Sequence, residues 1–352
     1  MRVIMLIDMD YFFVACEEIK RPELKQKPTI VGADPKEGKG RGVVMTCNYA
    51  ARKFGIHSAM PISQAYKIKP DAEYLPMDYS YYESKSNEVF SIIKTFAEKV
   101  EQVSIDEFFI DLSVTVSESS DALEYAKRIK EAIATRAKLP CSIGISENKL
   151  IAKMACEKAK PSGIKLVRGA DAKSFIAKMK LGELYGIGSK TEERLNALGY
   201  TTAEELAKAS IMSLMENFGS FGIELHNIAN AIDESEVVEA GDAKSISREQ
   251  TFESDTSNPA EISSSIRRLA SELGTELESK KISFKTIGIK LRYSDFSESL
   301  HGRTIRQTNQ PGQIAETALS LFKENSEGRR KIRKLGVRVS GLTSYRSQKS
   351  LF

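Results

Sequence analysis

SIDEFFIDL, residues 104–112, places two adjacent carboxylates, Asp106 and Glu107, between apolar residues. Successive side chains of a strand point to opposite faces, so a strand buried on both faces has no place for two charges in a row. The flanking runs VEQVSI and FFIDL therefore predict a β-hairpin whose turn lies close to the acidic pair. Taken by itself, the stretch favours an acidic turn exposed to solvent.

A second strand end supplies a third carboxylate. The apolar run VIMLI, residues 3–7, predicts a buried strand that ends at Asp8. If this strand lies beside the hairpin, Asp8, Asp106 and Glu107 converge. Like charges that close raise one another's pKa unless a cation neutralises them, and hard oxygen ligands suit Mg²⁺ or Mn²⁺. The pattern therefore predicts a site for two divalent ions, with a solvated acidic turn as the alternative.

Two neighbouring aspartates receive other roles. Asp10 directly precedes YFFVACEEIK, where its side chain could accept the free N–H groups of a first helical turn, so it is expected to be a helix cap. Asp111 lies inside the expected hairpin and is expected to be structural.

Residues 1–167 alternate between strand and helix patterns. After the strand at 3–7 come a helix over 81–100, the hairpin, a helix over 122–137, the strand CSIGIS and a helix that begins near Asn148. This order predicts a ferredoxin-like α+β domain, with helices on one face of an antiparallel sheet. The segment from Asp10 to about Met77, with strands at 28–32 and 42–47, is expected to form an inserted subdomain.

The rest of the chain divides into two further patterns. Residues 168–233 are purely helical in pattern, with Gly-containing turns, and residues 233–242 are acidic without a clear period, which is typical of a linker. Beyond the linker, strand patterns at 285–294, 303–308 and 331–342 and helix patterns at 262–277 and 315–325 predict a second α+β domain. The whole is a multidomain α+β protein.

Composition excludes several classes of protein. At 352 residues, 41% apolar and 28% charged, the chain is long enough for two or three domains with hydrophobic cores. No run reaches the roughly 18 apolar residues of a membrane span, and the N-terminus is too acidic for a signal peptide, so a cytoplasmic protein is expected. The four cysteines show no metal-type spacing.

Net charge is unevenly distributed along the chain. Residues 244–352 contain 20 basic and 12 acidic residues, whereas the preceding residues contain 32 and 36, in a chain with a net charge of +4. A basic C-terminal module indicates a polyanionic partner, although an ordinary solvated surface is the alternative.

Three stretches could contact phosphates. TCNYAARKFG places Tyr49 and Arg52 at the start of a helix that follows a strand, and Lys160 precedes a turn. LYGIGSK, residues 184–190, resembles a helix-hairpin-helix turn, whose N–H groups hold phosphates without reading bases. RRKIRKLGVRV, residues 329–339, alternates apolar and basic residues densely enough to follow a phosphate backbone. A surface helix, a plain helical turn and a charged edge strand are the respective alternatives.

These stretches, with IDMDYFF and ISENKLIAKMACEKAKPSGI, occur in the order and spacing of Y-family DNA polymerases of the DinB type, which the chain resembles over nearly its whole length. The resemblance implies a palm (1–10 and 78–167), fingers (11–77), a helix-hairpin-helix thumb (168–233), a linker (234–243) and a little finger (244–343). Residues 344–352 would form a tail.

The resemblance also implies roles for individual residues. Asp8, Asp106 and Glu107 match the catalytic, metal-binding carboxylates, and Met9 matches the backbone carbonyl ligand, for two Mg²⁺ ions with Mn²⁺ as a substitute. Phe13 matches the steric gate that excludes a ribose 2′-hydroxyl. The residues expected to hold the incoming dNTP are Phe12, Phe13, Thr46, Tyr49, Arg52 and Lys160. Those expected to contact DNA are Gly186, Gly188, Lys190, Arg330, Lys331, Arg333, Lys334 and Arg338.

Two departures from the family pattern leave these roles intact. Val43 and Met45 replace smaller residues in the expected roof over the templating base pair, and FFID replaces the commoner AYLD after the acidic pair. The terminal QKSLF resembles the opening of a sliding-clamp-binding peptide that stops after its fifth residue, with a tail that has no partner as the alternative.

The expected function is low-fidelity, template-directed DNA synthesis across damaged templates by a monomer that binds primer–template DNA and dNTP, without a membrane. A nucleotidyl cyclase and a non-catalytic DNA-structure protein are the alternatives, and the basic module and the acidic triad respectively argue against them.

Overall fold

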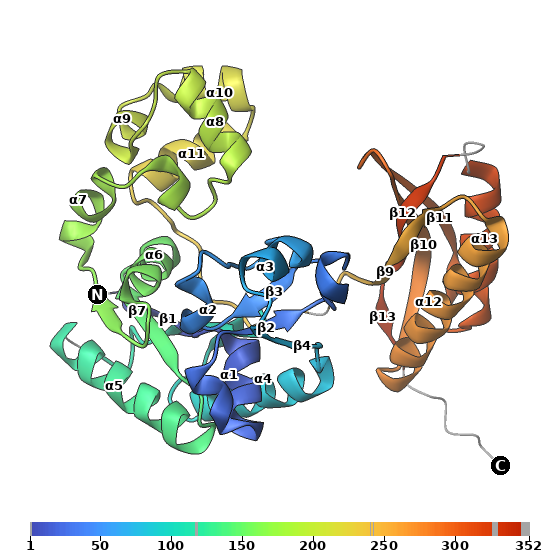
Figure 1. The fold of residues 1–352 in the computed structure, drawn as a ribbon. Helices are drawn as coiled ribbons and strands as arrows, with labels where there is room; N and C mark the ends of the chain where they lie inside the picture. The colour runs from blue at the N-terminus through green and yellow to red at the C-terminus, as the bar shows by residue number, and fades with distance from the viewer. Residues whose placement is uncertain (1, 117–118, 240, 242, 326–329, 346–352) are drawn as a thin grey trace, which may run out of the picture. The chain divides into compact units, whose positions relative to one another are not determined.

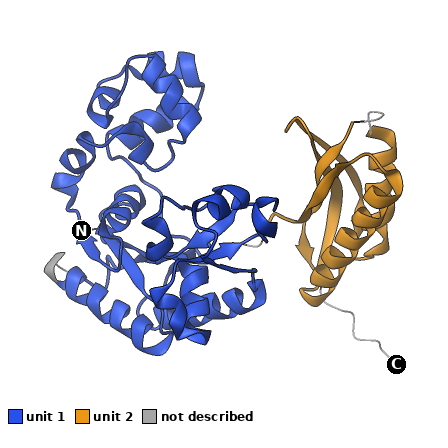
Figure 2. Ribbon diagram, in the orientation of Figure 1, with its two compact units in different colours: residues 1–240 blue, residues 241–352 orange. Residues whose placement is uncertain are grey.

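The computed structural model describes residues 2–116, 119–239, 241, 243–325 and 330–345. The chain forms two compact units, residues 1–240 and 241–352 (Figure 2). The boundary between the units falls inside the segment predicted as a linker. The terminal QKSLF lies outside the described residues.

A five-stranded sheet, here the central sheet, organises the first unit (Figure 1). Its strand order is β5-β6-β1-β7-β8, and all neighbours are antiparallel except β7 and β8. The strands are β1 (Ile4–Met9), β5 (Val100–Gln102), β6 (Glu107–Asp111), β7 (Cys141–Ser146) and β8 (Ile164–Leu166). The predicted hairpin is β5–β6, and the predicted pairing of residues 3–7 with the hairpin is the β1–β6 ladder.

Helices cover both faces of the central sheet, which differs from the single covered face that was predicted. The β1 residues Met5 and Ile7 pack against α1 (Phe12–Lys20), α4 (Tyr79–Lys94) and α5 (Ser119–Arg136). Ile4 and Leu6, which alternation places on the other face, pack against α6 (Lys149–Ala159). This two-sided burial explains why β1 reads as one continuous apolar run.

Gly144 in β7 lets α6 lie unusually close to the central sheet. A Cβ atom at this position would lie 1.9 Å from the carbonyl oxygen of Ala152 and 2.3 Å from the backbone nitrogen of Cys156. Any side chain would therefore push the helix backbone away from the sheet.

The insertion, residues 11–77, contains a second sheet of order β3-β2-β4. Its own hydrophobic core includes Ile30, Val44, Ile56 and Ile62. Its elements after α1 are β2 (Thr29–Gly32), β3 (Val44–Cys47), α2 (Tyr49–Arg52), α3 (Ile62–Ile68) and β4 (Glu73–Leu75), with short 3-10 helices at Pro22–Gln26 and Lys36–Gly38.

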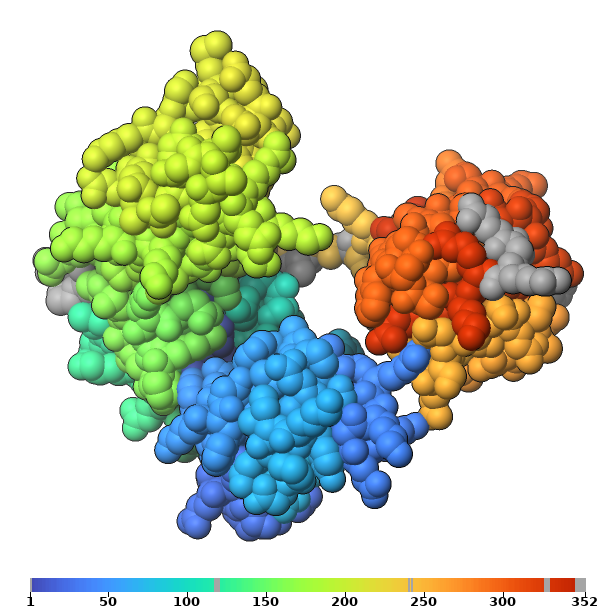
Figure 3. Space-filling model, turned by 45° about the horizontal axis from the view of Figure 1, so that its top comes forward, coloured from blue at the N-terminus to red at the C-terminus, as the bar shows by residue number. Residues whose placement is uncertain are grey.

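Residues 168–233, the helical subdomain, contain only helices and turns apart from one isolated β-bridge, as predicted. The helices are α7 (Ala172–Ala177), α8 (Ser189–Ala197), α9 (Ala203–Ala207), α10 (Ile211–Phe218) and α11 (Phe221–Ala229), with 3-10 helices at Gly169–Asp171 and Leu181–Glu183. Their core includes Leu150 and Met154 of α6, so this helix is shared with the central sheet. The subdomain is the yellow-green surface in Figure 3, and the insertion is the blue one.

The segment after α11 packs against the first unit in spite of its linker-like composition. Val237 is 3% exposed and packs with Ile4, Leu6 and Phe109 on the α6 face of the central sheet. The Asp233 carboxylate accepts a 2.8 Å hydrogen bond from the backbone nitrogen of Leu150. Acidic side chains that composition assigns to solvent therefore hold this segment in place.

The second unit is a four-stranded antiparallel sheet, order β11-β10-β12-β9, whose core it shares with two helices. Its elements are β9 (Ser245–Thr256), α12 (Pro259–Ser279), β10 (Ile282–Tyr293), β11 (Glu298–Thr308), α13 (Gly312–Asn325), β12 (Ile332–Ser340) and β13 (Thr343–Ser344). Strand β9 was not predicted. It lies at the sheet edge and its side chains are mostly polar, so it lacks the apolar alternation by which strands are recognised.

Candidate active site

Strand register places the predicted carboxylates at one edge of the central sheet. Asp8 lies opposite Glu107 in the β1–β6 ladder, and the backbone nitrogen of Met9 donates to the carbonyl of Asp106 over 2.9 Å. Asp8 is 4% exposed, whereas Asp106 and Glu107 are half-buried. The Asp106 carboxylate accepts a 2.6 Å hydrogen bond from Ser104 in the turn. The acidic pair thus lies where β6 begins and does not form a free solvated turn.

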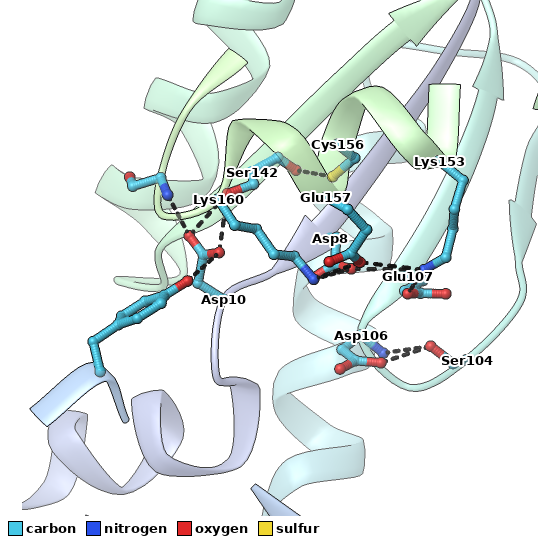
Figure 4. A network of polar contacts seen from close by, with 12 residues as sticks. Asp8, Asp10, Ser104, Asp106, Glu107, Ser142, Lys153, Cys156, Glu157 and Lys160 are labelled. Carbon is cyan, nitrogen blue, oxygen red and sulfur yellow. Dashed lines mark hydrogen bonds and ion pairs between the residues drawn. The ribbon is translucent and has the colours of Figure 1, made fainter. Parts of the chain in front are cut away.

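Helix α6 adds a row of charges to this edge (Figure 4). Asn148 caps the helix by accepting from the backbone nitrogen of Ile151. Lys153 forms an ion pair with Glu107, and its Nζ lies 4.0 Å from the Asp8 carboxylate and 3.7 Å from that of Glu157. The spacing of four residues places Lys153 and Glu157 on one helical face.

Lys160 follows α6 and completes the cluster. Its Nζ lies 2.8 Å from Asp8 and 2.9 Å from Glu157. Two lysines therefore offset part of the negative charge of three carboxylates at this edge, where burial would otherwise make that charge costly.

Burial shifts the pKa values of this cluster. Burial raises the pKa of Asp8 to about 8, although Lys160 opposes the shift and Glu107 adds to it. Burial also raises the pKa of Asp106, with Ser104 opposing. The pKa of Lys160 is raised because Asp8 and Glu157 outweigh burial, which acts in the opposite direction. Lys160 therefore stays charged at neutral pH, while Asp8 lies between its charged and protonated forms.

The cluster can supply oxygen ligands to a cation. One oxygen from each of Asp8, Glu107 and Glu157 lies within 4.8 Å of the others. Three carboxylates that converge on one point and are paired with only two lysine ammonium groups fit a divalent metal ion, which binds hard oxygen ligands. Asp106 is directed toward Ser104 and is not in this group (Figure 4). Glu157 and Lys153 were not predicted, although their four-residue spacing before Lys160 could have indicated a charged helical face.

The predicted nucleotide residues line one cavity of about 200 Å³ with the carboxylates. Its walls come from β1, α1, β3, α2 and the segments at 106–107 and 160. Three residues that were not assigned to the nucleotide site, Tyr11, Met45 and Ser58, also line the cavity. All predicted metal and dNTP residues line it: Asp8, Met9, Phe12, Phe13, Thr46, Tyr49, Arg52, Asp106, Glu107 and Lys160.

The insertion positions Tyr49 and Arg52 on one side of this cavity. Asn48 caps α2 by accepting from the backbone nitrogen of Ala51 over 3.1 Å. The Arg52 guanidinium lies 4.9 Å from the centre of the Tyr49 ring and donates to the carbonyl of Cys47 over 3.2 Å. Because α2 has only four residues, its helix dipole is weak. The Tyr49 and Arg52 side chains are therefore the groups that could hold an anion here.

Phe13 forms another wall. Its ring stacks on that of Tyr82 at 4.7 Å between centroids, and the Tyr82 hydroxyl donates to Glu17 over 2.9 Å. Phe108, one of the two departures after the acidic pair, is fully buried and packs near Phe90, 6.4 Å away between ring centroids. The departure therefore changes packing beneath the cavity.

Asp10 is not a helix cap, contrary to prediction. The residue at the start of α1 is Tyr11, in a left-handed conformation and without a side-chain cap. Asp10 is 1% exposed and instead accepts hydrogen bonds from Ser142, Ser162 and Tyr49. These partners lie far away in sequence, so no local pattern could have indicated them.

The predicted DNA-contacting turn lies beside the carboxylate cluster. Gly186 and Gly188 are exposed, Gly186 adopts a φ of +94°, and Lys190 is exposed near the start of α8. A cavity of about 740 Å³ extends from Glu107 and Lys153 to Tyr185 and Gly186. A strand of nucleic acid that rests on the turn could therefore reach the cluster through this cavity.

The basic strand β12 differs from its prediction. Lys331 and Arg338 are exposed, but the Arg333 and Lys334 side chains are only 26% and 29% exposed. Lys334 forms an ion pair with Glu249 of β9. Regular alternation of apolar and basic residues does not hold at these two positions, because a register shift between Ile332 and Lys334 interrupts it.

Acidic partners also neutralise other basic residues of β12 and its N-terminal flank. Arg330 lies 3.0 Å from Asp295 and 3.7 Å from the centre of the Tyr293 ring. Arg333 lies 4.0 Å from Asp255. Arg338 donates to Ser245 over 3.0 Å. The positive field of this strand is thus weaker than its sequence indicates.

Known proteins resemble the chain throughout. The impB/mucB/samB family model matches residues 7–157, its C-terminal domain matches 243–351, and the helix-hairpin-helix motif of the same family matches 169–200. DNA polymerase IV 2 of Methanosarcina mazei is 43% identical over 97% of this chain and 92% of its own length. DNA polymerase IV of Methanoculleus marisnigri is 38% identical over 97% and 94%.

Solved structures agree with the sequence relatives. A Y-family DNA polymerase chimera of Dbh and Dpo4 superposes with a TM-score of 0.89 at 28% identity, covering 97% of this chain and all of the chimera. An insertion ternary complex of Dbh DNA polymerase gives a TM-score of 0.70 at 28% identity, with the same coverage. The chain belongs to the Y family of DNA polymerases. This Y-family member is of the DinB type and is a DNA-directed DNA polymerase of the translesion class.

Family membership also confirms the multidomain α+β architecture that was predicted. The domains of this chain match those of a Y-family polymerase. They are a ferredoxin-like domain with an insertion, an all-helical domain with a helix-hairpin-helix motif and a C-terminal α+β domain. Y-family polymerases use divalent metal ions, and the acidic cluster of this chain could bind one. No helix among the described residues has the length and apolar character needed to cross a membrane.

Proposed function

We propose that the edge of the central sheet is the polymerase active site, where Asp8, Asp106 and Glu107, with the Met9 carbonyl, bind two Mg²⁺ ions and Mn²⁺ can substitute. The observation that supports this best is the convergence of these residues with the nucleotide residues on one cavity. When bound, such a pair of ions supplies activation of a hydroxyl and stabilisation of a leaving phosphate.

The residues of the chain bind and orient the substrates. Lys160, Arg52 and Tyr49 surround the cavity with donors and positive charge, and with Thr46 they hold the triphosphate of the dNTP, which Phe12 also contacts. Lys160 would also remain beside Asp8 and lower its pKa, which favours the ionised carboxylate that a metal ligand requires. Glu157 is the other partner of this lysine.

Phe13 acts as the steric gate. Because Tyr82 supports its ring from behind, the ring cannot retreat from the sugar of the incoming nucleotide. A ribose 2′-hydroxyl would clash with the Phe13 ring, so the site selects deoxynucleotides by excluding ribonucleotides. The roof residue Met45 lines the same cavity and is 40% exposed.

The primer–template contacts use the helical subdomain and the second unit. Gly186, Gly188 and Lys190 hold phosphates through backbone N–H groups and one cation, without reading bases. The second unit would contact the DNA phosphates through Arg330, Lys331, Arg333, Lys334 and Arg338. Those that pair with acidic residues contribute only to the extent that DNA displaces these partners. The boundaries 1–10 with 78–167, 11–77, 168–233 and 244–343 for palm, fingers, thumb and little finger belong to this proposal.

Three further features of the proposal concern the chain in the cell. We propose a cytoplasmic monomer in which a sliding clamp recognises the terminal QKSLF. Binding of the full chain to a sliding clamp, and loss of that binding when residues 348–352 are replaced by alanine, would test the last point.

Primer extension tests the proposed function. With Mg²⁺, each dNTP is supplied separately on undamaged and lesion-bearing templates, and we expect addition of the complementary nucleotide on both. A reaction with NTP and no DNA tests for cyclase activity and should give no product. DNA binding without extension on either template would overturn the assignment.

A further inference from the structure

The buried carboxylate of Asp10 joins three segments that are far apart in sequence (Figure 4). The Ser142 hydroxyl in β7 donates to its two oxygens over 2.9 and 3.2 Å. The backbone nitrogen of Ser162, in the turn after α6, donates over 2.8 Å. The Tyr49 hydroxyl, at the start of α2, donates over 3.3 Å. Asp10 therefore connects the central sheet, the turn after α6 and the insertion.

Two of these donors lie in, or close in sequence to, residues that line the nucleotide cavity. Tyr49 lines the cavity from the insertion, and Ser162 lies two residues after Lys160, which lines it from the end of α6. Lys160 itself is extended, with φ −64° and ψ 139°, so a fixed Ser162 restricts where the lysine side chain starts. One carboxylate thus determines the separation of two groups that would contact the same triphosphate.

The charge of Asp10 makes this connection stronger than neutral hydrogen bonds. Asp10 is 1% exposed and Ser142 is fully buried, and hydrogen bonds to an ionised acceptor are shorter and stronger than those between neutral groups. An asparagine of the same shape offers one acceptor oxygen and two N–H donors, so it would present a donor to at least one of the three donors. Because the Tyr49 and Ser142 hydroxyls can also accept, the isosteric substitution reverses one of these bonds and removes the charge, which weakens the connection without removing volume.

We propose that Asp10 is a positioning residue for the nucleotide triphosphate: it holds the Tyr49 hydroxyl and the Lys160 turn at the separation that the triphosphate requires. The proposal rests on the proposed function of the cavity. Asp10 does not line the cavity and acts only through Tyr49 and Ser162. The Tyr49 hydroxyl has a single proton, so Asp10 orients it before the nucleotide binds and a phosphate oxygen then takes over as its acceptor.

Single-nucleotide incorporation by the full chain tests the role of Asp10. Asp10→Asn should raise KM for the dNTP about tenfold and change kcat less than about threefold, because binding is lost before chemistry. Ser142→Ala is the matched control: it removes a donor to the same carboxylate but leaves both cavity groups connected, and KM should stay within about twofold of wild type. An unchanged KM in Asp10→Asn, or a loss confined to kcat, would overturn the proposal.

A double-mutant cycle identifies the route. If Asp10 acts through the Tyr49 hydroxyl, the effects of Asp10→Asn and Tyr49→Phe on KM should fall short of multiplying in the double variant. Fully multiplicative effects would overturn that route. An inactive wild-type chain would instead refute the proposed function, so the two failures are distinguishable.

Hydrogen exchange keeps the test decisive if Asp10→Asn does not fold. In the wild-type chain the Ser162 amide should exchange as slowly as the amides of β7, because its acceptor is buried. Exchange at the rate of an exposed turn would show that Asp10 does not hold this segment, and would overturn the proposal.

Discussion

The acidic cluster of the first unit and the basic strand β12 of the second are both rich in charge, but they are built in opposite ways. The carboxylates of Asp8, Glu107 and Glu157 come from three separate elements and converge in space. The basic residues of β12 adjoin one another in sequence, yet Lys334 and Arg333 face acidic partners on β9. Charge density along a chain therefore overstates the field of β12 and understates that of the cluster.

The largest expected effect tests whether convergence defines the active site. Asp106→Ala or Glu107→Ala should lower single-nucleotide incorporation by at least about a thousandfold, because loss of a metal ligand removes several kcal/mol of transition-state stabilisation. Primer–template affinity, measured by fluorescence anisotropy, should change little. Asp111→Asn is the control, since Asp111 lies on the same strand but accepts only from Ser113 among its described contacts, and it should retain activity.

The second prediction compares two lysines near the end of α6. Lys160→Ala should raise KM for the dNTP about 10- to 100-fold, the range for loss of a hydrogen bond to a charged group. Lys158→Ala should have almost no effect, because its 2.6 Å pair with Glu183 is exposed and such pairs contribute little. Equal responses would mean that proximity to the cluster does not decide the role of a lysine.

A third prediction concerns the Phe13 ring, which its neighbour Tyr82 holds in place, as acidic neighbours hold the basic side chains of β12. Phe13→Ala should lower discrimination between dNTP and rNTP by about tenfold or more, because the clash with the 2′-hydroxyl disappears. Incorporation of matched dCTP and CTP by the same variant gives the ratio directly. Unchanged sugar selection would refute the gate, even if overall activity fell.

A fourth, smaller effect follows from the raised pKa of Asp8. A folded-state pKa of about 8, above the ordinary value of 3.8, means that this group stabilises the metal-free fold at low pH and loses that contribution as pH rises toward 8. Mg²⁺ must displace the proton, so the rise in Tm on adding Mg²⁺ should grow between pH 6 and pH 9. Asp8→Asn should abolish this dependence on pH. A shift independent of pH in the wild type would contradict it.

The smallest expected effect tests the pairing of β12. Lys331→Ala should reduce the slope of log affinity against log salt for DNA binding by about 1. Lys334→Ala, three residues away, should reduce it less, because Glu249 already neutralises this lysine. Equal slopes would show that DNA displaces the acidic partner, and would restore the field that the sequence indicates.

The sequence predicted the parts of the site that strand ends and family motifs control. The apolar run before Asp8 and the hairpin around Glu107 were enough to anticipate the β1–β6 pairing. Motif positions then identified Tyr49, Arg52 and Lys160, which the structure brings to one cavity. Their roles remain predictions.

What the sequence could not predict depends on partners that are distant along the chain. Asp10 resembles a helix cap locally, but its acceptors are satisfied by residues from β7, α2 and the turn after α6. Strand β9 is polar because it lies at an edge, and the bulge in β12 shifts Arg333 and Lys334 by an amount that alternation cannot anticipate. Each of these features is decided by tertiary contacts that override the local pattern.

The glycine at position 144 has a consequence for how such an enzyme can change. Since α6 carries Lys153 and Glu157 and leads into Lys160, its distance from β7 sets the height of all three charges above the sheet. A single methyl group at residue 144 would move the three together, without substituting any residue that touches substrate. A substitution at Gly144 could therefore change the positions of Lys153, Glu157 and Lys160 together, which no substitution of one of these three residues can do.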